Sequence, residues 1–404
     1  MEKIMRAGTP GFVPERLVEA REARGITTQL ALANLIGKPR STVSRWETGE
    51  ATPEPETLDT LAAQLNVRRS YFLRPIQATG QGAFFARARK SVEKGVQSAV
   101  RARLRWTADI SGALQHYFDF PDYDIPDSLR SISYKSLRDE DIEDIATILR
   151  THWQLGEGPI SSMISVLEAH GFVVARDEVG SGRLDGLCHW SEADGRPYIL
   201  LATDKQSFFR SQMDAAHEMG HAILHRYVDQ ATFERDFDLI ETQAFRLASA
   251  FLMPAKTFSL EARYPTLNGL LSMKERWRVS IKAMIKRCTD LGIITDTTST
   301  QLYKHYSAKG WNRGEPLDRE FPEDPPKLLA RAIKELVETG ERSKNELLEN
   351  EFIIPASDIE TLTSLPRGWL RSDGDVVSFP LQRRAAKPTE GEVINLFGWH
   401  QSKR

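Results

Sequence analysis

Two histidines and a glutamate in the middle of the chain have the types and the spacing of a metal-dependent hydrolase. They form the run His217-Glu218-Met-Gly-His221, which falls in a stretch expected to be one long helix, 205–226. Residues four apart lie one turn above each other on a helix, so both imidazoles can reach one cation at about 2.1 Å. Glu218 falls beside that pair, where it can take a proton from a metal-bound water instead of binding the metal. Because zinc lowers the pKa of bound water towards about 7, this spacing predicts hydrolysis of a peptide bond with Glu218 as the general base.

A third ligand is expected from the next helix, predicted over 241–253. Glu241 opens this helix twenty residues beyond His221. Ala244 and Ala248 lie one and two turns further on, and their small side chains would let the two helices approach each other. Two histidines and one glutamate, with the fourth position left to water, form a catalytic zinc site.

Two nearby residues leave alternatives open. Asp238 is the rival of Glu241 as third ligand, because it lies one turn earlier if the helix begins early. His225 shares the face of His221. A capping or core role is expected for it, with stabilisation of an oxyanion or substrate binding as the alternative.

The elements that must position these residues follow from hydrophobic periodicity. Asp204 is expected to cap the metal-binding helix. Short β-rich runs bounded by Gly, Asp and Pro predict a small sheet before that helix, with strands at 171–176, 187–190 and 198–202. Helices are expected before the sheet at 136–153 and 160–170, and after it as two short helices within 270–291 and one at 327–348.

The N-terminal part predicts a separate five-helix bundle. Pro14 opens its first helix, and the other four are expected at 28–36, 41–47, 55–65 and 71–73. In the second helix, Leu30, Ala31 and Leu35 are expected to face inward. In the third, Ser41 is the expected cap, Val43 and Trp46 the buried pair, and Thr42, Ser44 and Arg45 the outward residues, which would suit a DNA major groove.

A run of basic residues follows the bundle. Between Ile76 and Arg105 there are seven bases and one acid, Glu93. The bases are Arg87, Arg89, Lys90, Lys94, Arg101, Arg103 and Arg105. Such a stripe either lies along phosphates or forms a solvated helix face, and its position beside a predicted DNA-binding unit leaves both interpretations open.

Composition sets the remaining limits. A chain of 404 residues suggests two or three domains, and 40% apolar with 27% charged residues is typical of a soluble protein. No run approaches the ~18 apolar residues of a membrane helix, and the N-terminus lacks the features of an export signal, so a cytoplasmic protein that does not enter membranes is expected. The two cysteines, 100 positions apart, argue against disulfides and a thiolate metal site.

The N-terminal bundle resembles the Xre (Cro/cI-type) repressor family. The likeness rests on Thr28-Gln29, the run Ser41 to Glu47, Gly49, Pro53, and Leu58 with Leu61-Ala62. It implies a recognition helix at 41–47 and a homodimer on two half-sites of a double-stranded DNA operator. The DNA contacts that it implies are Gln29, Arg40, Ser41, Thr42, Ser44 and Arg45.

The middle of the chain resembles the ImmA/IrrE metallopeptidase family. The likeness rests on the strand 197–202, HEMGHAILH at 217–225, Glu241-Thr-Gln-Ala244, Ala248 and Phe251-Leu-Met-Pro254. It implies zinc, or manganese, held by His217, His221 and Glu241, with Glu218 as general base and a protein partner, such as a repressor, as the substrate. The family often has a glutamate where this chain has Gln243, which puts the tuning of the metal in doubt more than its ligands.

The expected fold is multidomain and mainly α with a small β-sheet. It comprises an N-terminal five-helix helix-turn-helix bundle (11–75), a basic helical linker (76–130), an α+β zincin-like metallopeptidase domain (131–262) and a mixed C-terminal domain for sensing or oligomerisation (263–404). The expected function is that of a DNA-binding transcription regulator with a zinc endopeptidase domain that cleaves a protein partner such as a repressor and that can stay latent until a signal arrives. The alternatives are a regulator whose metal site is sensory or structural, and an antitoxin-like repressor that uses the peptidase fold as a docking surface.

Overall fold

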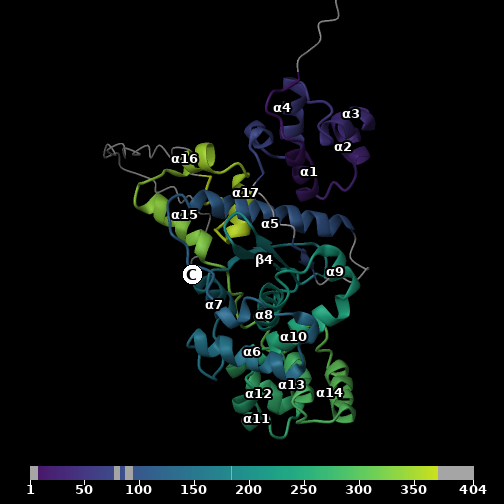
Figure 1. Cartoon of the computed structure of the whole chain (residues 1–404), viewed down its shortest axis with the longest axis vertical. Helices are drawn as coiled ribbons and strands as arrows, with labels where there is room; N and C mark the ends of the chain where they lie inside the picture. Colours follow the sequence, from purple (N-terminus) through teal and green to yellow (C-terminus); the bar gives the residue numbers. More distant parts are fainter. Residues whose placement is uncertain (1–7, 77–81, 87–93, 183, 372–404) are drawn as a thin grey trace, which may run out of the picture. The chain divides into compact units, whose positions relative to one another are not determined.

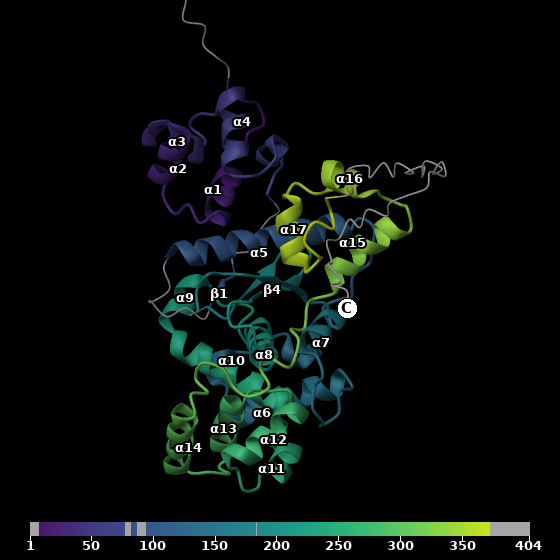
Figure 2. The same ribbon diagram turned by 180° about the vertical axis from the view of Figure 1, so that it is seen from behind.

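The computed structural model describes residues 8–76, 82–86, 94–182 and 184–371, and Figures 1 and 2 show it from opposite sides. Most of the described chain is helical around one small sheet, which confirms the predicted fold class. Among the described residues, no helix combines the length and the apolar character needed to cross a bilayer.

The N-terminal bundle has the predicted five helices. They are α1 (Pro14–Ala23), α2 (Gln29–Ile36), α3 (Arg40–Glu47), α4 (Pro55–Gln64) and the 3₁₀-helix η1 (Arg69–Leu73). Pro14 takes the first position of α1, where its missing N–H costs nothing. Thr28 caps α2 by accepting a hydrogen bond from the Ala31 N–H, and Gly37 ends α2 with a left-handed φ of 65°.

Two local predictions in this bundle are wrong. Helix α3 begins at Arg40 after Pro39, and Ser41 makes no capping hydrogen bond. The buried residues of α2 are Leu32 and Ala33, whereas Leu30 is 53% exposed and Leu35 46%. The second error arises because so short a helix packs against α3 and α4 through a narrow face that apolar content alone does not identify.

A sheet of four strands lies in the middle of the chain. Its strands are β1 (Phe85–Ala86), β2 (Val173–Asp177), β3 (Gly186–Ser191) and β4 (Arg196–Ala202), in the order β1-β3-β4-β2. Strands β2 and β4 are parallel and the other two pairs are antiparallel. The three predicted strands are present; β1 was not predicted.

Both faces of the sheet are covered. Side chains alternate along a strand, so Ile199 and Leu201 of β4 join one hydrophobic core while Tyr198 and Leu200 join another. Helix α8 (Phe208–Leu224) packs on the first face and α5 (Lys94–Leu114) on the second, as Figures 1 and 2 both show. The sheet therefore separates the two cores.

The remaining helices divide between these cores. The first core contains residues of α6 (Asp139–His152), α7 (Met163–Ala169), α9 (Gln230–Arg235), α10 (Phe237–Leu252), α11 (Ala255–Glu261), α12 (Leu267–Trp277), α13 (Ile281–Asp290) and α14 (Asp296–Ala308). The second contains residues of the N-terminal bundle, α5, α15 (Leu328–Glu338), the π-helix η4 (Leu347–Glu351), which follows α16 (Lys344–Glu346), and α17 (Ala356–Thr363). Single 3₁₀ turns lie at η2 (Asp127–Leu129) and η3 (Tyr134–Ser136).

The arginines of α5 are bound within the fold. Arg105 Nε lies 2.9 Å from Glu19 Oε1 of α1, and Arg103 pairs at 2.5 Å with Asp177 at the end of β2. Arg101 lies over the ring of Phe84 at 5.1 Å, and burial lowers its pKa. For these three arginines, both interpretations of the basic stripe, a phosphate-binding surface and a solvated face, are therefore wrong.

Several predicted features lie outside the described residues. They are the first three bases of the stripe, Arg87, Arg89 and Lys90, and residues 372–404 of the predicted C-terminal domain.

Candidate metal centre and nucleic-acid interface

Helix α8 carries the two histidines of the predicted metal site. Ser207 caps it, because its Oγ accepts a hydrogen bond from the Arg210 N–H, whereas Asp204, the expected cap, accepts one from the Val179 N–H. Both His217 and His221 are buried, because α8 lies between the sheet and α10.

Helix α10 approaches α8 very closely at one point. A Cβ atom added to Gly220 would lie 2.9 Å from the Cα and the carbonyl oxygen of Ala244, so only glycine fits there. The contact confirms the expectation that Ala244 lets the helices press together. It also brings Glu241, one turn before Ala244, level with the two histidines.

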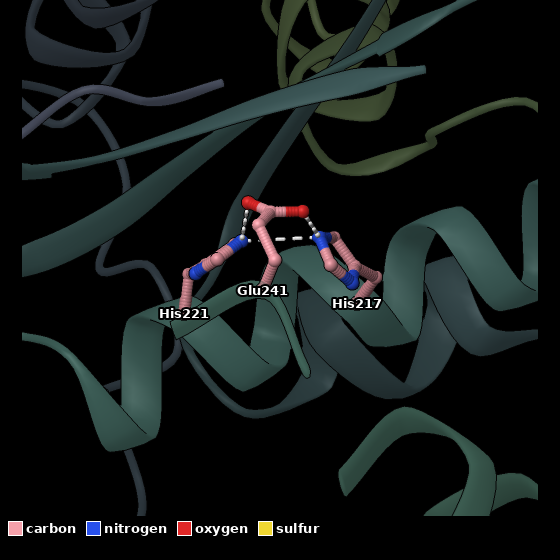
Figure 3. A group of neighbouring side chains, drawn as sticks. All are labelled: His217, His221 and Glu241. Carbon is pink, nitrogen blue, oxygen red and sulfur yellow. Dashed lines mark hydrogen bonds and ion pairs between the residues drawn. The ribbon is translucent and has the colours of Figure 1, made fainter. Parts of the chain in front are cut away.

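Figure 3 shows that His217, His221 and Glu241 converge on one point. The two Nε2 atoms are 3.0 Å apart, Glu241 Oε2 is 3.4 Å from His217 Nε2, and Glu241 Oε1 is 3.2 Å from His221 Nε2. Burial alone would raise the pKa of Glu241, but its contacts with His217 and His221 outweigh burial and hold the pKa below its usual range. The carboxylate therefore stays ionised.

This donor set fits a divalent cation. One ligand atom from each of the three residues lies within 4.8 Å of the others. Two ring nitrogens directed at each other beside an ionised carboxylate are best satisfied by a cation among them, and zinc accepts both kinds of ligand. The alternative ligand Asp238 is exposed in the first turn of α10 and does not join this group.

Glu218 is carried by α8, and its side chain lies against strand β3. Its side chain is buried, and a Cβ atom added to Gly186 would approach its Oε1 to 2.7 Å. Glycine at the start of β3 thus leaves room for this carboxylate. The sequence did not predict this role of Gly186, because strand propensities do not show that a glycine is needed to leave room for a neighbouring side chain.

A chain of hydrogen bonds leads away from the metal site through His225. His221 Nδ1 and His225 Nδ1 are 3.3 Å apart, and His225 Nε2 lies 3.2 Å from Gln243 Oε1. The amide nitrogen of Gln243 donates to the carbonyl oxygen of Tyr134 at 2.7 Å, which fixes the orientation of the amide. Burial, with a further contribution from His221, lowers the pKa of His225 to about 3, so its ring is neutral.

This chain of hydrogen bonds sets the tautomer of His221. Because the oriented Gln243 offers an oxygen, His225 Nε2 carries a proton and donates it, which leaves its Nδ1 to accept from His221 Nδ1. His221 Nε2 then has its lone pair directed to the metal position. His225 is also the C-cap residue of α8, in line with its expected role.

The residues predicted to contact DNA are carried by α2 and α3. Arg40, Ser41 and Arg45 are exposed, and Thr42 and Ser44 are half-buried. Val43 and Trp46 are buried as predicted and fix the orientation of α3.

Gln29 differs from the other predicted DNA contacts. Its amide nitrogen donates to Glu47 Oε2 at 3.0 Å, and Glu47 Oε1 accepts at 2.8 Å from Arg21 Nε. Gln29, Arg40 and Glu47 are among the residues that line a hollow of about 510 Å³ between α2 and α3. The hydrogen bond to Glu47 thus already orients the Gln29 side chain, which lies beside the exposed residues of α3.

The comparisons with known families match both regions. A helix-turn-helix family model matches residues 17–72, and a peptidase family model, described as the IrrE N-terminal-like domain, matches residues 167–289. The second range includes every residue of the His217, Glu218, His221 and Glu241 group. No curated protein matches the chain. The chain therefore joins a region that matches the helix-turn-helix family to a region that matches the IrrE-type peptidase domain, which supports the two predicted resemblances.

Proposed function

We propose that this protein is a DNA-binding transcription regulator whose central domain is a zinc-dependent endopeptidase that cleaves a protein partner, such as a repressor. The observation that carries the proposal is the convergence of His217, His221 and Glu241 within 4.8 Å, with the buried Glu218 next to His217. The domain limits predicted at residues 75, 130 and 262 stay predictions.

In this proposal His217, His221 and Glu241 hold zinc, with manganese as the alternative metal. Zinc bound there would supply a Lewis acid that polarises the peptide carbonyl. Glu218 takes a proton from the attacking water and returns it to the leaving nitrogen. Three protein ligands leave a position for water or substrate, whereas a structural zinc site is closed by a fourth protein ligand.

The substrate would bind as an extended peptide along the edge of β3 opposite β4, the edge on which the two-residue strand β1 lies in this structure. The other edge of β3 is paired with β4, and the Gly186 end of β3 lies against Glu218. A peptide added to a sheet edge gains main-chain hydrogen bonds whatever its sequence, and this route would carry it past the general base.

For DNA we propose that α3 enters the major groove of an operator and that two copies of the chain bind two half-sites. Arg40, Ser41, Thr42, Ser44 and Arg45, together with Gln29, would make the contacts. Replacing Arg45 by Ala should weaken operator binding, whereas Arg105→Ala, which removes an arginine that pairs with Glu19 inside the fold, should weaken it much less. Unchanged binding by Arg45→Ala would show that α3 is not the recognition helix.

A second function is favoured by the depth of the site. His221 is fully buried and Glu218 is 1% exposed, which suits a metal site that senses a metal or supports the fold. That alternative predicts no turnover, so a change confined to the general base separates the two.

The deciding experiment compares cells that carry the wild type, Glu218→Gln, and the control Glu140→Gln, which changes an exposed glutamate on α6. Glu218→Gln should keep zinc and operator binding because it alters neither the metal ligands nor α3. A new protein N-terminus, found by mass spectrometry with the wild type and the control but missing with Glu218→Gln, supports the peptidase. Identical N-termini and unaltered gene regulation in all three strains would favour the sensory or structural role.

A further inference from the structure

Of the described residues 82–86, the last three lie along the outer edge of β3, and the first two pair with residues 228 and 229 beside it. Strand β1 pairs antiparallel with β3, with Phe85 opposite Cys188 and Ala86 opposite Leu187. In the sequence these residues fall between η1 of the DNA-binding domain and α5. The edge that the proposed function gives to a substrate is thus occupied by the protein's own chain.

Main-chain hydrogen bonds hold this segment in an extended form. Gly82 forms a bridge with Asp229, and the Ala83 N–H donates to the carbonyl oxygen of Val228 at 3.0 Å. The Phe84 N–H donates to Gln230 Oε1 at 3.3 Å. Contacts made chiefly through the backbone are those by which a peptide adds to a sheet edge.

The side chain of Phe85 points to the metal side of the sheet. Its ring stacks on the imidazole of His221 with centroids 4.9 Å apart and an angle of 8° between the planes, and it meets Phe233 edge-on at 5.2 Å. Phe85 is 1% exposed. It therefore fills an aromatic pocket with one wall made by a proposed metal ligand.

Phe84 points to the opposite face of the sheet. Its ring stacks on His189 with centroids 3.9 Å apart, and the guanidinium of Arg101 lies over it at 5.1 Å. Phe84 thus holds the segment in place without contacting the metal site. Its contacts can be removed while the proposed ligands stay intact.

The segment lies close to the general base Glu218, so it decides whether a substrate can reach that residue. Leu187, opposite Ala86, is the neighbour of Gly186, which lies against the Glu218 carboxylate. A substrate paired with β3 up to the general base would need the place that residues 82–86 occupy. The segment and the substrate therefore exclude each other.

We propose that residues 82–86 are a built-in substrate mimic that closes the peptidase site. The site then takes an extended peptide with an aromatic side chain at the place of Phe85, and it opens when such a peptide displaces the segment. This inference rests on the proposed function, because it assigns the β3 edge to the substrate.

The test measures binding of a fluorescein-labelled peptide with the sequence of residues 80–88 to the zinc-loaded full chain carrying Glu218→Gln, so that no cleavage interferes. Adding Phe84→Ala and Gln230→Ala removes the ring contacts of Phe84 and one hydrogen bond of the segment. Binding should become at least about tenfold tighter, which corresponds to about 1.4 kcal/mol, because the internal competitor is weakened. Phe118→Ala, at another half-buried phenylalanine, is the matched control and should give no gain.

A peptide with alanine in place of the residue that corresponds to Phe85 should bind at least about tenfold more weakly to the loosened variant. Hydrogen exchange at the Cys188 amide, which faces Phe85 of β1, reports whether the segment has left. The single change Gln230→Ala is the milder variant if the double change does not fold. The proposal is overturned if the chain carrying only Glu218→Gln binds the peptide as tightly as the variants that also carry the segment-loosening changes. It is also overturned if variants whose segment has been released still do not bind the peptide.

The same variants distinguish this inference from the proposed function. A loosened variant with Glu218 intact that binds the peptide without cutting it would support the mimic and contradict the peptidase.

Discussion

Two buried clusters of charged groups in the central region can be compared directly. One is the metal-site cluster of His217, His221 and Glu241, and the other is Lys274 with Glu315 and Asp318. In the second cluster the Lys274 ammonium donates to Asp318 Oδ1 at 2.7 Å and to the carbonyl oxygen of Pro316 at 2.7 Å, and lies 2.9 Å from Glu315 Oε2.

The Lys274 cluster is complete. Its three contacts match the three N–H donors of an ammonium group, and Glu315 accepts further hydrogen bonds from the Ile281 and Lys282 N–H groups. In the metal-site cluster, two nitrogens and a carboxylate converge in the way that ligands of a cation do. The comparison shows two arrangements of buried charged groups. In a cluster that stabilises the fold, every charged group is matched by its neighbours. In a cluster suited to a metal ion, the ligand atoms point at one common position.

The largest expected effect is in the metal-site cluster. Glu241→Ala should remove zinc from the protein almost completely, because two imidazoles alone bind the ion far more weakly; the loss should exceed the 10- to 100-fold typical of residues that only orient ligands. Zinc per chain after dialysis, measured by mass spectrometry, checks this. Asp238→Ala, one turn earlier on α10, should retain the metal, and equal zinc content in both variants would remove the contrast between the clusters.

In the Lys274 cluster, the expected effect is on stability. Lys274→Met leaves two buried carboxylates without their cation, so the free energy of unfolding should fall by about 3–5 kcal/mol. Denaturant unfolding measures it, with Lys282→Met at an exposed position as the control. A loss below 1 kcal/mol would mean that this cluster does not stabilise the fold.

Another buried carboxylate, that of Glu168, sharpens the comparison, because backbone N–H groups take the place of a cation. Glu168 accepts hydrogen bonds from the N–H groups of Lys327 and Leu328, at the start of α15, yet burial raises its pKa to about 7. The folded pKa lies above the unfolded value of 4.5, so this contribution to stability is fully present below pH 4.5 and is lost as the pH rises through 7. The loss is about 3 kcal/mol.

Glu168→Gln should therefore abolish that part of the pH dependence. Free energies of unfolding at pH 4.5 and pH 8 should differ by less in the variant than in the wild type. The same difference in both proteins would contradict the assignment.

The smallest expected effect concerns the hydrogen bonds behind His221. Gln243→Ala removes the acceptor that orients His225, so zinc affinity should fall by about 10- to 100-fold. Gln243→Glu keeps a carboxyl oxygen there and should restore most of the affinity. Competition with a fluorescent chelator measures both, and an unchanged affinity in Gln243→Ala would show that His221 needs no such support.

Local features of the site and the fold could be predicted from sequence. The spacing of His217 and His221 fixes their common face, and Val43 with Trp46 sets the orientation of α3, because helical periodicity needs no knowledge of distant residues. Contacts between residues far apart could not be predicted. Nothing near Phe85 indicates that it stacks on a ring 136 positions away, and a guanidinium that lies on Phe84 has the same sequence signature as one that faces solvent.

The inward arginines of α5 have a consequence for how salt should act on DNA binding. A cationic group that never reaches a phosphate adds nothing to the salt sensitivity of an operator complex, because it displaces no counterion from the duplex. Arg101, Arg103 and Arg105 would together have steepened the slope of log affinity against log salt by about 2.7, at about 0.9 for each contact. Without them, affinity for the duplex should persist to higher ionic strength than the count of basic residues suggests.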